Sequence, residues 1–374
     1  SDNTTPSARA GAIADESAEA TPVPTADQLF NQGAVAYQTG DYRAAFSAWA
    51  QALQLYQASR APLDEALTMS SLGTVFKRFS DYSAALDCYQ QALSIFQDLE
   101  EPLGEAQSLN YLGEIHIEQG QYLQAKTYYE AAQAIFADLA VPVVVNPPPA
   151  EAYTLRFQAI NLDNLGILYG ELGQYARALD FHQQALTIRQ TLAEPQFEKI
   201  TLLNLGLIYK RQENYLAALT HYEQALAISR DLNDRLGEAI ALNNLALLYN
   251  QLGEPARGLE PLQQALSLYR ELGDRTGEGN TLDSLGTLYL SLGQYDQAQQ
   301  SYEQALTLLR TVGQRALEKA VLGHIGDLYV AQNQPELAIV FYKQSVELTE
   351  ALRQTLQTLP REQREAYAAT VDTT

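Results

Sequence analysis

The sequence is poor in the residues that build metal sites and covalent cross-links. It has one cysteine, Cys88, which excludes an internal disulfide framework and a cysteine-based zinc site. Its four histidines show neither a His–x–x–x–His pair nor a Glu–x–x–His spacing, so no helical face offers two metal ligands. We therefore predict no bound metal. The four histidines are His116, His182, His221 and His324.

Basic residues are also scarce. The chain has 24 Lys+Arg against 45 Asp+Glu, a formal net charge of −21. Nucleic acids and anionic lipids need a concentrated basic surface, so neither is an expected partner. The longest apolar stretch, near Val141–Val145, is far too short to cross a bilayer. We expect a cytoplasmic protein without membrane insertion, although a chain beginning at Ser1 is also compatible with a removed leader.

The sequence is dominated by an internal repeat. One small residue, usually Gly in a Leu–Gly pair, returns every 40 residues, except for a single step of 53 between Gly113 and Gly166. The difference is one insertion of 13 residues. Eight repeats follow, three before the insertion and five after it. Their central small residues are Gly33, Gly73, Gly113, Gly166, Gly206, Ala246, Gly286 and Gly326.

Each repeat has the pattern of two amphipathic helices. In the fifth repeat, Leu202, Leu205 and Tyr209 lie three and four residues apart, which puts them on one helical face. A polar turn follows at 213–214, and a second apolar face runs through 215–228. Turns in other repeats carry glycine, which adopts a left-handed conformation without a Cβ penalty. We expect the aromatic residues of the second helices to fill the space between hairpins. These are Trp49, Tyr89, Tyr129, Tyr222, Tyr302 and Tyr342.

The pattern Leu–x–x–Leu–Gly–x–x–Tyr, followed by Gly–x–Tyr–x–x–Ala, resembles the tetratricopeptide repeat over about residues 26–352. The usual terminal Pro is missing, and extra residues at 231–237 and 273–277 join the repeats. This longer form resembles the 40-residue repeats of kinesin light chain and of the spindle adaptor Pins/LGN. The resemblance implies an all-α fold: a right-handed superhelical α-solenoid of eight hairpins with a concave groove and a C-terminal capping helix.

Five segments are expected from this pattern. Residues 1–24 are rich in Ser, Thr, Ala and Pro and should form a flexible N-terminal segment. The insertion contains consecutive prolines, which favour an extended backbone, and is expected to be an exposed loop, with a hinge or a docking strip as alternatives. The boundaries are 1–24, repeats 1–3 at 25–139, the Pro-rich insertion at 140–151, repeats 4–8 at 152–352, and a helical extension at 353–374.

The resemblance also implies which side chains face the groove: those three and two residues before the central Gly, and one, four and five after it. Asn164, Asn204 and Asn244 are then equivalent and form a ladder of amides, each able to donate to and accept from a peptide backbone. The alternative is that these amides only keep the face soluble. Two further amides of the sixth repeat complete the set, Asn243 and Asn250.

Basic and apolar positions accompany the amides. Lys–Arg pairs fall at groove positions in two repeats and could hold a partner's carboxylates; alternatively they only extend over neighbouring aromatic rings. Apolar contact would come from three residues one position after the central Gly. The basic residues are Lys77, Arg78, Lys210 and Arg211, and the apolar ones are Ile167, Leu207 and Leu247.

No catalytic residues and no cofactor are predicted. Cys88 has no histidine in its own repeat to act as a base, and the glycines are spread one or two per repeat instead of forming a phosphate-binding loop. The pattern therefore predicts a non-catalytic protein–protein interaction scaffold that binds a peptide or helix of a partner. Self-assembly through the ends of the array is a weaker alternative.

A second functional hypothesis comes from the tail. Residues 350–367 resemble the connector that follows such repeats in bacterial CHAT proteins, which are caspase-like proteases. That resemblance implies that the chain is the regulatory half of a bacterial protease. Its partner would then include a C-terminal catalytic domain that this sequence does not contain.

Overall fold

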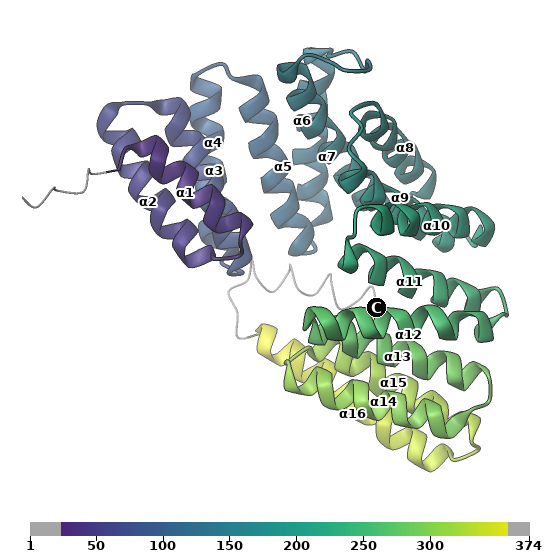
Figure 1. Cartoon of the computed structure of the whole chain (residues 1–374). Helices are drawn as coiled ribbons and strands as arrows, with labels where there is room; N and C mark the ends of the chain where they lie inside the picture. Colours follow the sequence, from purple (N-terminus) through teal and green to yellow (C-terminus); the bar gives the residue numbers. More distant parts are fainter. Residues whose placement is uncertain (1–23, 358–374) are drawn as a thin grey trace, which may run out of the picture.

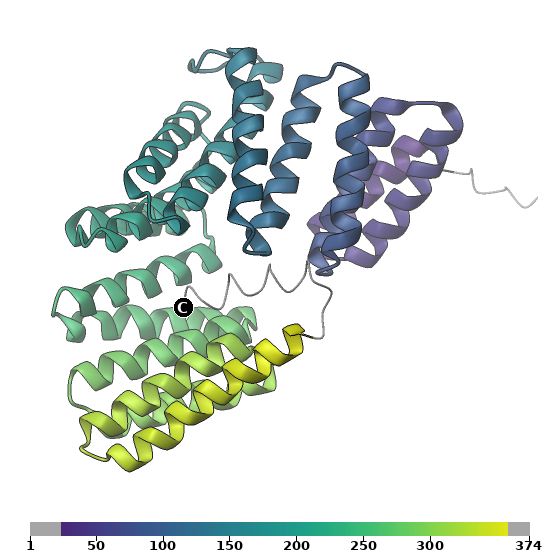
Figure 2. The ribbon, with the colours of Figure 1, turned by 180° about the vertical axis from the view of Figure 1, so that it is seen from behind.

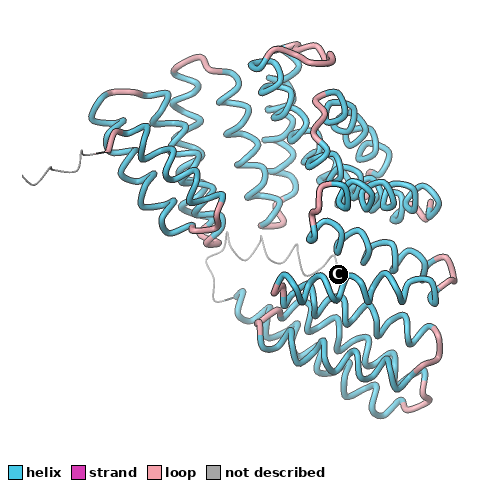
Figure 3. The backbone as a smooth tube through the Cα atoms, in the orientation of Figure 1, coloured by secondary structure: helices cyan, strands magenta, loops and turns pink. Residues whose placement is uncertain are grey.

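The computed structural model describes the backbone of residues 24–357 and the side chains of residues 24–348. This part of the chain consists of sixteen α-helices joined by loops, without strands (Figure 3). The predicted all-α solenoid is confirmed. The helices form eight hairpins, here called repeats 1 to 8, each with an odd-numbered first helix and an even-numbered second helix.

The bounds of the helices follow the period of the sequence. The first helices are α1 (Ala26–Gln38), α3 (Pro62–Arg78), α5 (Pro102–Glu118), α7 (Pro149–Glu171), α9 (Pro195–Arg211), α11 (Arg235–Gln251), α13 (Arg275–Ser291) and α15 (Arg315–Ala331). The second helices are α2 (Tyr42–Ser59), α4 (Tyr82–Asp98), α6 (Tyr122–Leu139), α8 (Tyr175–Thr191), α10 (Tyr215–Asp231), α12 (Pro255–Leu272), α14 (Tyr295–Thr311) and α16 (Pro335–Gln357).

The hairpins stack side by side along a curved path (Figure 1; from behind, Figure 2). Each second helix contacts the first helix of the next repeat, so each apolar face is covered from both sides. From α3 to α15 the first helices also contact one another. In the described part, no two second helices come as close. The first helices therefore lie on the inner, shorter side of the curve.

Each hairpin turn places one residue in the left-handed region. As predicted, glycine occupies this position in five repeats, for example Gly40 with φ 82° and Gly253 with φ 78°. The other three turns use Ser80, Glu213 and Asn333 with φ close to 60°. A left-handed backbone strains a side chain with a Cβ, so these three turns carry a local cost that glycine avoids.

The extra residues of the longer repeat are divided between the loop and the start of the first helix. α11 begins at Arg235 and α13 at Arg275, inside the segments expected to join the repeats. Asp234 caps α11 by accepting from the Gly237 N–H at 3.1 Å, and Asp274 caps α13 in the same way at 2.9 Å. Such caps satisfy backbone N–H groups that a helix start leaves without partners.

The insertion is divided between a loop and a helix. α6 ends at Leu139 and α7 begins at Pro149, so residues 140–148 form the loop at the top of Figure 3. α7 has 23 residues, whereas α9 has 17. Part of the insertion thus extends α7, and Pro149 occupies a first-turn position where its missing N–H costs nothing.

The buried core repeats with the sequence. Tyr89, Tyr222 and Tyr302 are completely buried, as expected for residues between hairpins. Tyr89, for example, packs with Leu112 and Ile115 of the next repeat.

The C-terminal extension begins as a continuation of α16. This helix runs to Gln357, and the remainder of the extension lies outside the described residues, as does the N-terminal segment. Tyr342 of α16 is 36% exposed, unlike its buried equivalents, because no ninth repeat covers it within the described residues.

Candidate functional site

The candidate site is the inner face formed by α7, α9 and α11. Contacts between successive first helices bring the predicted groove positions of repeats 4, 5 and 6 next to one another. Ile167 and Leu207 are 37% and 36% exposed, and Leu247 is partly buried. These side chains provide apolar surface that is accessible to a partner.

Three of the predicted amides are free to bind. Asn204 on α9 and Asn244 on α11 are half-buried, and neither forms a hydrogen bond with another described residue. Asn250, at the end of α11, is also half-buried and without such a bond. Asn243 differs, because it is only 9% exposed and its Oδ1 is buried without a partner. We therefore leave Asn243 out of the proposed binding surface.

The third amide of the ladder is engaged within the protein. Asn164 donates through Nδ2 to Glu114 Oε1 at 3.4 Å, a long contact between repeats 4 and 3. The ladder is thus available at Asn204 and Asn244, whereas Asn164 would have to leave Glu114 to contact a partner.

The first Lys–Arg pair is held by internal partners. Lys77 Nζ lies 2.7 Å from Glu114 Oε2 and 3.2 Å from Glu118 Oε1. Burial by itself lowers the pKa of Lys77, but Glu114 and Glu118 outweigh it and the pKa is raised. Arg78 donates to the Tyr37 hydroxyl at 3.2 Å and lies over the Tyr42 ring. A partner's carboxylate would have to displace these contacts.

The two residues of the second Lys–Arg pair differ in their contacts. Arg211 Nη2 lies 2.9 Å from Glu171 Oε1, and its Nη1 donates to the Gly170 carbonyl at 3.2 Å. Lys210 is half-buried and has no ion-pair partner among the side chains of residues 24–348. Burial, together with the neighbouring Arg211 charge, lowers the pKa of Lys210. Of these four basic residues, Lys77 and Arg211 pair with carboxylates and Arg78 contacts two tyrosines, whereas Lys210 has no such contact among the described side chains.

Sequence reasoning missed the acidic partners of these cations. Acidic residues are so common in this sequence that three of them did not stand out as partners. These are Glu114, Glu118 and Glu171. The signal was present in the register: Glu114 and Glu118 lie one and five residues after Gly113, at groove positions of the repeat that follows Lys77.

The histidines are packed against aromatic or glycine neighbours. His116 stacks on Tyr128 and His221 on Tyr209, each at 5.3 Å between ring centroids. His182 is fully buried, and its ring faces the Cα of Gly166.

His182 also forms a polar contact with Asp163, which is shared with Thr201. His182 Nδ1 lies 3.0 Å from Asp163 Oδ1, and Thr201 donates to Asp163 Oδ2 at 2.8 Å. This network joins repeats 4 and 5.

Cys88 lies in an environment that suppresses thiolate formation. Burial, with added repulsion from Asp87 and Asp81, raises the pKa of its thiol to about 11. At neutral pH it is therefore protonated and a poor nucleophile. Among the described residues, no three His, Cys, Asp or Glu side chains are grouped as metal ligands would be, and no helix could span a membrane.

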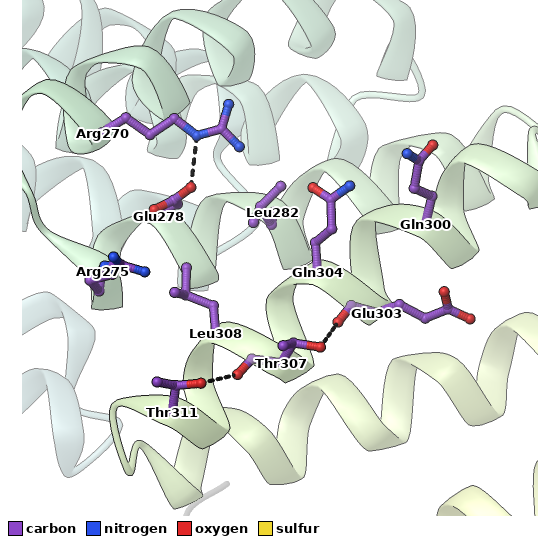
Figure 4. Close-up of a pocket in the computed structure, with 10 residues that line it drawn as sticks. All are labelled: Arg270, Arg275, Glu278, Leu282, Gln300, Glu303, Gln304, Thr307, Leu308 and Thr311. Atoms are coloured by element: carbon purple, nitrogen blue, oxygen red, sulfur yellow. Dashed lines mark hydrogen bonds and ion pairs between the residues drawn. The ribbon is translucent and has the colours of Figure 1, made fainter.

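A separate hollow of about 510 Å³ lies between α12, α13 and α14 (Figure 4). Two of its charged groups pair with each other: Arg270 Nε lies 2.7 Å from Glu278 Oε1 across its rim. Thr307 and Thr311 each donate to a backbone carbonyl of α14. None of the predicted groove residues lines it, and we assign it no function.

Comparisons with known proteins agree with this fold. Family models described as Tetratricopeptide repeat match residues 25–98, 198–271, 248–311 and 278–351, and others match 71–140 and 162–197. No curated protein matches the sequence of the chain.

Several solved structures share the solenoid. The apo form of RapI has a TM-score of 0.63 at 16% identity, with 78% of this chain and 99% of RapI covered. The apo quorum sensor NprR from B. thuringiensis has a TM-score of 0.62 at 15% identity, covering 86% and 87%. The Rap conjugation gene regulator of plasmid pLS20, in complex with the Phr* peptide, has a TM-score of 0.58 at 14% identity, covering 91% and 99%. At such identities the likeness shows the fold alone.

Proposed function

Since the chain belongs to the tetratricopeptide repeat family, we propose that it is a non-catalytic scaffold that binds an extended segment of a partner protein on its inner face. The proposed site is centred on α9 and α11, in repeats 5 and 6. Amides and leucines make up most of this surface, and neither is an effective acid, base or nucleophile at neutral pH.

The observation that carries the proposal is the pair of unengaged amides. Asn204 and Asn244 are half-buried on neighbouring first helices, and no described residue bonds to them. An amide has two donor hydrogens and an acceptor oxygen, so each can pair with a backbone N–H and C=O whatever the peptide sequence. Leu207 and Leu247 lie three residues further along the same helices and would contact the apolar side chains of that peptide.

The structural comparisons support a peptide as the occupant. The Rap conjugation gene regulator, which has a similar fold, is described in complex with a peptide. At 14% identity this supports only the general capacity of such a solenoid to hold a peptide, and it does not identify a partner of this chain.

The proposal is tested by selecting binders from a displayed library of short random peptides, using the full chain. We expect the double variant Asn204→Ala/Asn244→Ala to keep its circular dichroism spectrum and melting temperature. Its affinity for the selected peptides should fall about tenfold or more, because about two hydrogen bonds of about 1 kcal/mol are lost.

The matched control is Gln183→Ala/Gln263→Ala. It removes two exposed amides from the second helices α8 and α12, and should leave affinity unchanged. Equal affinities for the wild type and the Asn204→Ala/Asn244→Ala variant would show that peptides bind elsewhere.

A further inference from the structure

Lys77 and Lys210 occupy the same position in their repeats but have different neighbours. Each is the next-to-last residue of its first helix, four residues after the central glycine. Lys77 reaches forward to repeat 3, where Glu114 Oε2 and Glu118 Oε1 lie 2.7 Å and 3.2 Å from its Nζ. In repeat 2, a lysine at this position is thus paired with two carboxylates of the following first helix.

The following first helix does not supply those carboxylates to Lys210. The residues of α11 one and five positions after Ala246, equivalent to Glu114 and Glu118, are Leu247 and Gln251. Both are neutral. The pKa shifts of the two lysines reflect this difference, since that of Lys77 is raised and that of Lys210 is lowered by burial and by Arg211.

No other described group compensates Lys210. Arg211, its neighbour, is committed to Glu171 and to the Gly170 carbonyl. The ammonium is half-buried, and burying an unpaired charge is costly. It also lies on the same helix as Asn204 and one repeat from Asn244, two of the amides without partners among the described residues.

We propose that Lys210 anchors a carboxylate of the bound polypeptide, which occupies the place that Glu114 and Glu118 occupy beside Lys77. This inference rests on the proposed function and adds the chemistry of the ligand: an extended peptide that carries an acidic side chain or its own C-terminal carboxylate. The protein has a net charge of −21, so most of its charged side chains repel an acidic peptide. The unpaired cation of Lys210 would attract the peptide carboxylate at one point and so fix the register of the peptide.

The chain itself suggests the decisive substitution. Gln251→Glu gives repeat 6 the carboxylate that repeat 3 has at the same position, so it should be tolerated by the fold. The carboxylate introduced at position 251 should pair with Lys210 and compete with the carboxylate of the peptide. Lys210→Met removes the cation and keeps the aliphatic stem. Gln251→Met is the neutral control, because it changes the same position without adding a charge.

The probes are peptides chosen from the random library described above, each synthesised with a free and with an amidated C-terminus. We expect the binders to contain a carboxylate. Lys210→Met and Gln251→Glu should each weaken their binding by about tenfold or more, and Gln251→Met should not. Loss of binding on amidation identifies the C-terminal carboxylate, whereas loss on Asp→Asn or Glu→Gln change in the peptide identifies a side chain.

A second measurement is independent of the peptides. The pKa of the Lys210 ammonium, followed by NMR, should lie below the ordinary lysine value in the free protein. It should rise in Gln251→Glu and on peptide binding. An ordinary pKa in the free protein that Gln251→Glu leaves unchanged would overturn the inference.

Different results would contradict the carboxylate anchor and the proposed function. Peptides that bind and depend on Asn204 and Asn244, but are indifferent to Lys210→Met and Gln251→Glu, overturn the carboxylate anchor and leave the proposed function intact. A library that yields no peptide dependent on Asn204 and Asn244 overturns the proposed function and the anchor together.

Discussion

The central glycine of each first helix lies directly against a ring of the second helix. A Cβ added at Gly206 would lie 2.4 Å from Tyr222 Cε1, and one at Gly286 would lie 2.4 Å from Tyr302 Cε1. Repeat 6 differs from the other repeats at both positions. Its central residue is Ala246, and the residue that replaces the tyrosine is the smaller Leu262, which packs with it. Glycine is therefore required by the ring, and alanine is allowed where the ring is absent.

This pairing gives a prediction at the residue scale. Gly206→Ala should destabilise the protein by about 1–2 kcal/mol, because overpacking against a fully buried tyrosine outweighs the better helix propensity of alanine. Urea denaturation measures the change in the free energy of unfolding.

The matched variant is Gly206→Ala/Tyr222→Leu, which copies repeat 6. Its loss should be smaller than the sum of the two single losses by about 1 kcal/mol or more. Additive losses would show that the ring does not exclude the Cβ.

At the scale of the helices, some helix starts have a side-chain cap and others do not. Asp274 accepts from the Gly277 N–H, whereas Gln294, at the start of α14, forms no side-chain cap. We predict that Asp274→Ala costs about 1 kcal/mol in the free energy of unfolding and that Gln294→Ala costs much less. Equal effects in denaturant titrations would show that the cap hydrogen bond does not contribute.

Repeats 7 and 8 are linked by a titratable pair. His324 Nδ1 lies 2.8 Å from Asp283 Oδ1, and this hydrogen bond raises the pKa of His324 against the opposing effect of burial. Because the folded pKa is above the unfolded one, the stabilisation is complete below the unfolded pKa of about 6.5 and is lost as pH rises through the folded pKa.

Asp283→Asn should therefore lower the pKa of His324 in an NMR titration. Its destabilisation should be larger at about pH 5.5 than at about pH 8.5. A loss of stability that is the same at both pH values would contradict a role for the charged pair.

At the scale of the molecule, periodicity in the sequence was sufficient for the architecture. The eight central small residues, the aromatic positions and the turn glycines predicted eight hairpins in order, because each is enforced by a contact that recurs at a fixed spacing. The length of α7 was not predictable in this way. It depends on how a single, non-repeated insertion divides between loop and helix, and no second copy reveals its pattern.

The candidate site was only partly predictable for a related reason. The groove positions followed from the resemblance, but whether a side chain is free depends on what lies opposite it in the next repeat. Lys77 and Lys210 have the same position and the same neighbour in sequence. Lys77 pairs with Glu114 of the next first helix, whereas the residue equivalent to Glu114 in the helix after Lys210 is the neutral Leu247. The CHAT-related alternative concerns residues 350–367, which lie only partly within the described backbone, and it stays a prediction.

The location of the bound polypeptide is tested most directly by site-specific photo-crosslinking. A photoreactive amino acid is placed at Leu207, on the inner face of α9, or at Leu216, which is 73% exposed on α10. Each protein is irradiated with the same library-selected peptide. We predict a crosslinked product from position 207 that excess unlabelled peptide suppresses, and none from position 216. Efficient crosslinking from position 216 and none from position 207 would place the peptide outside the concave groove.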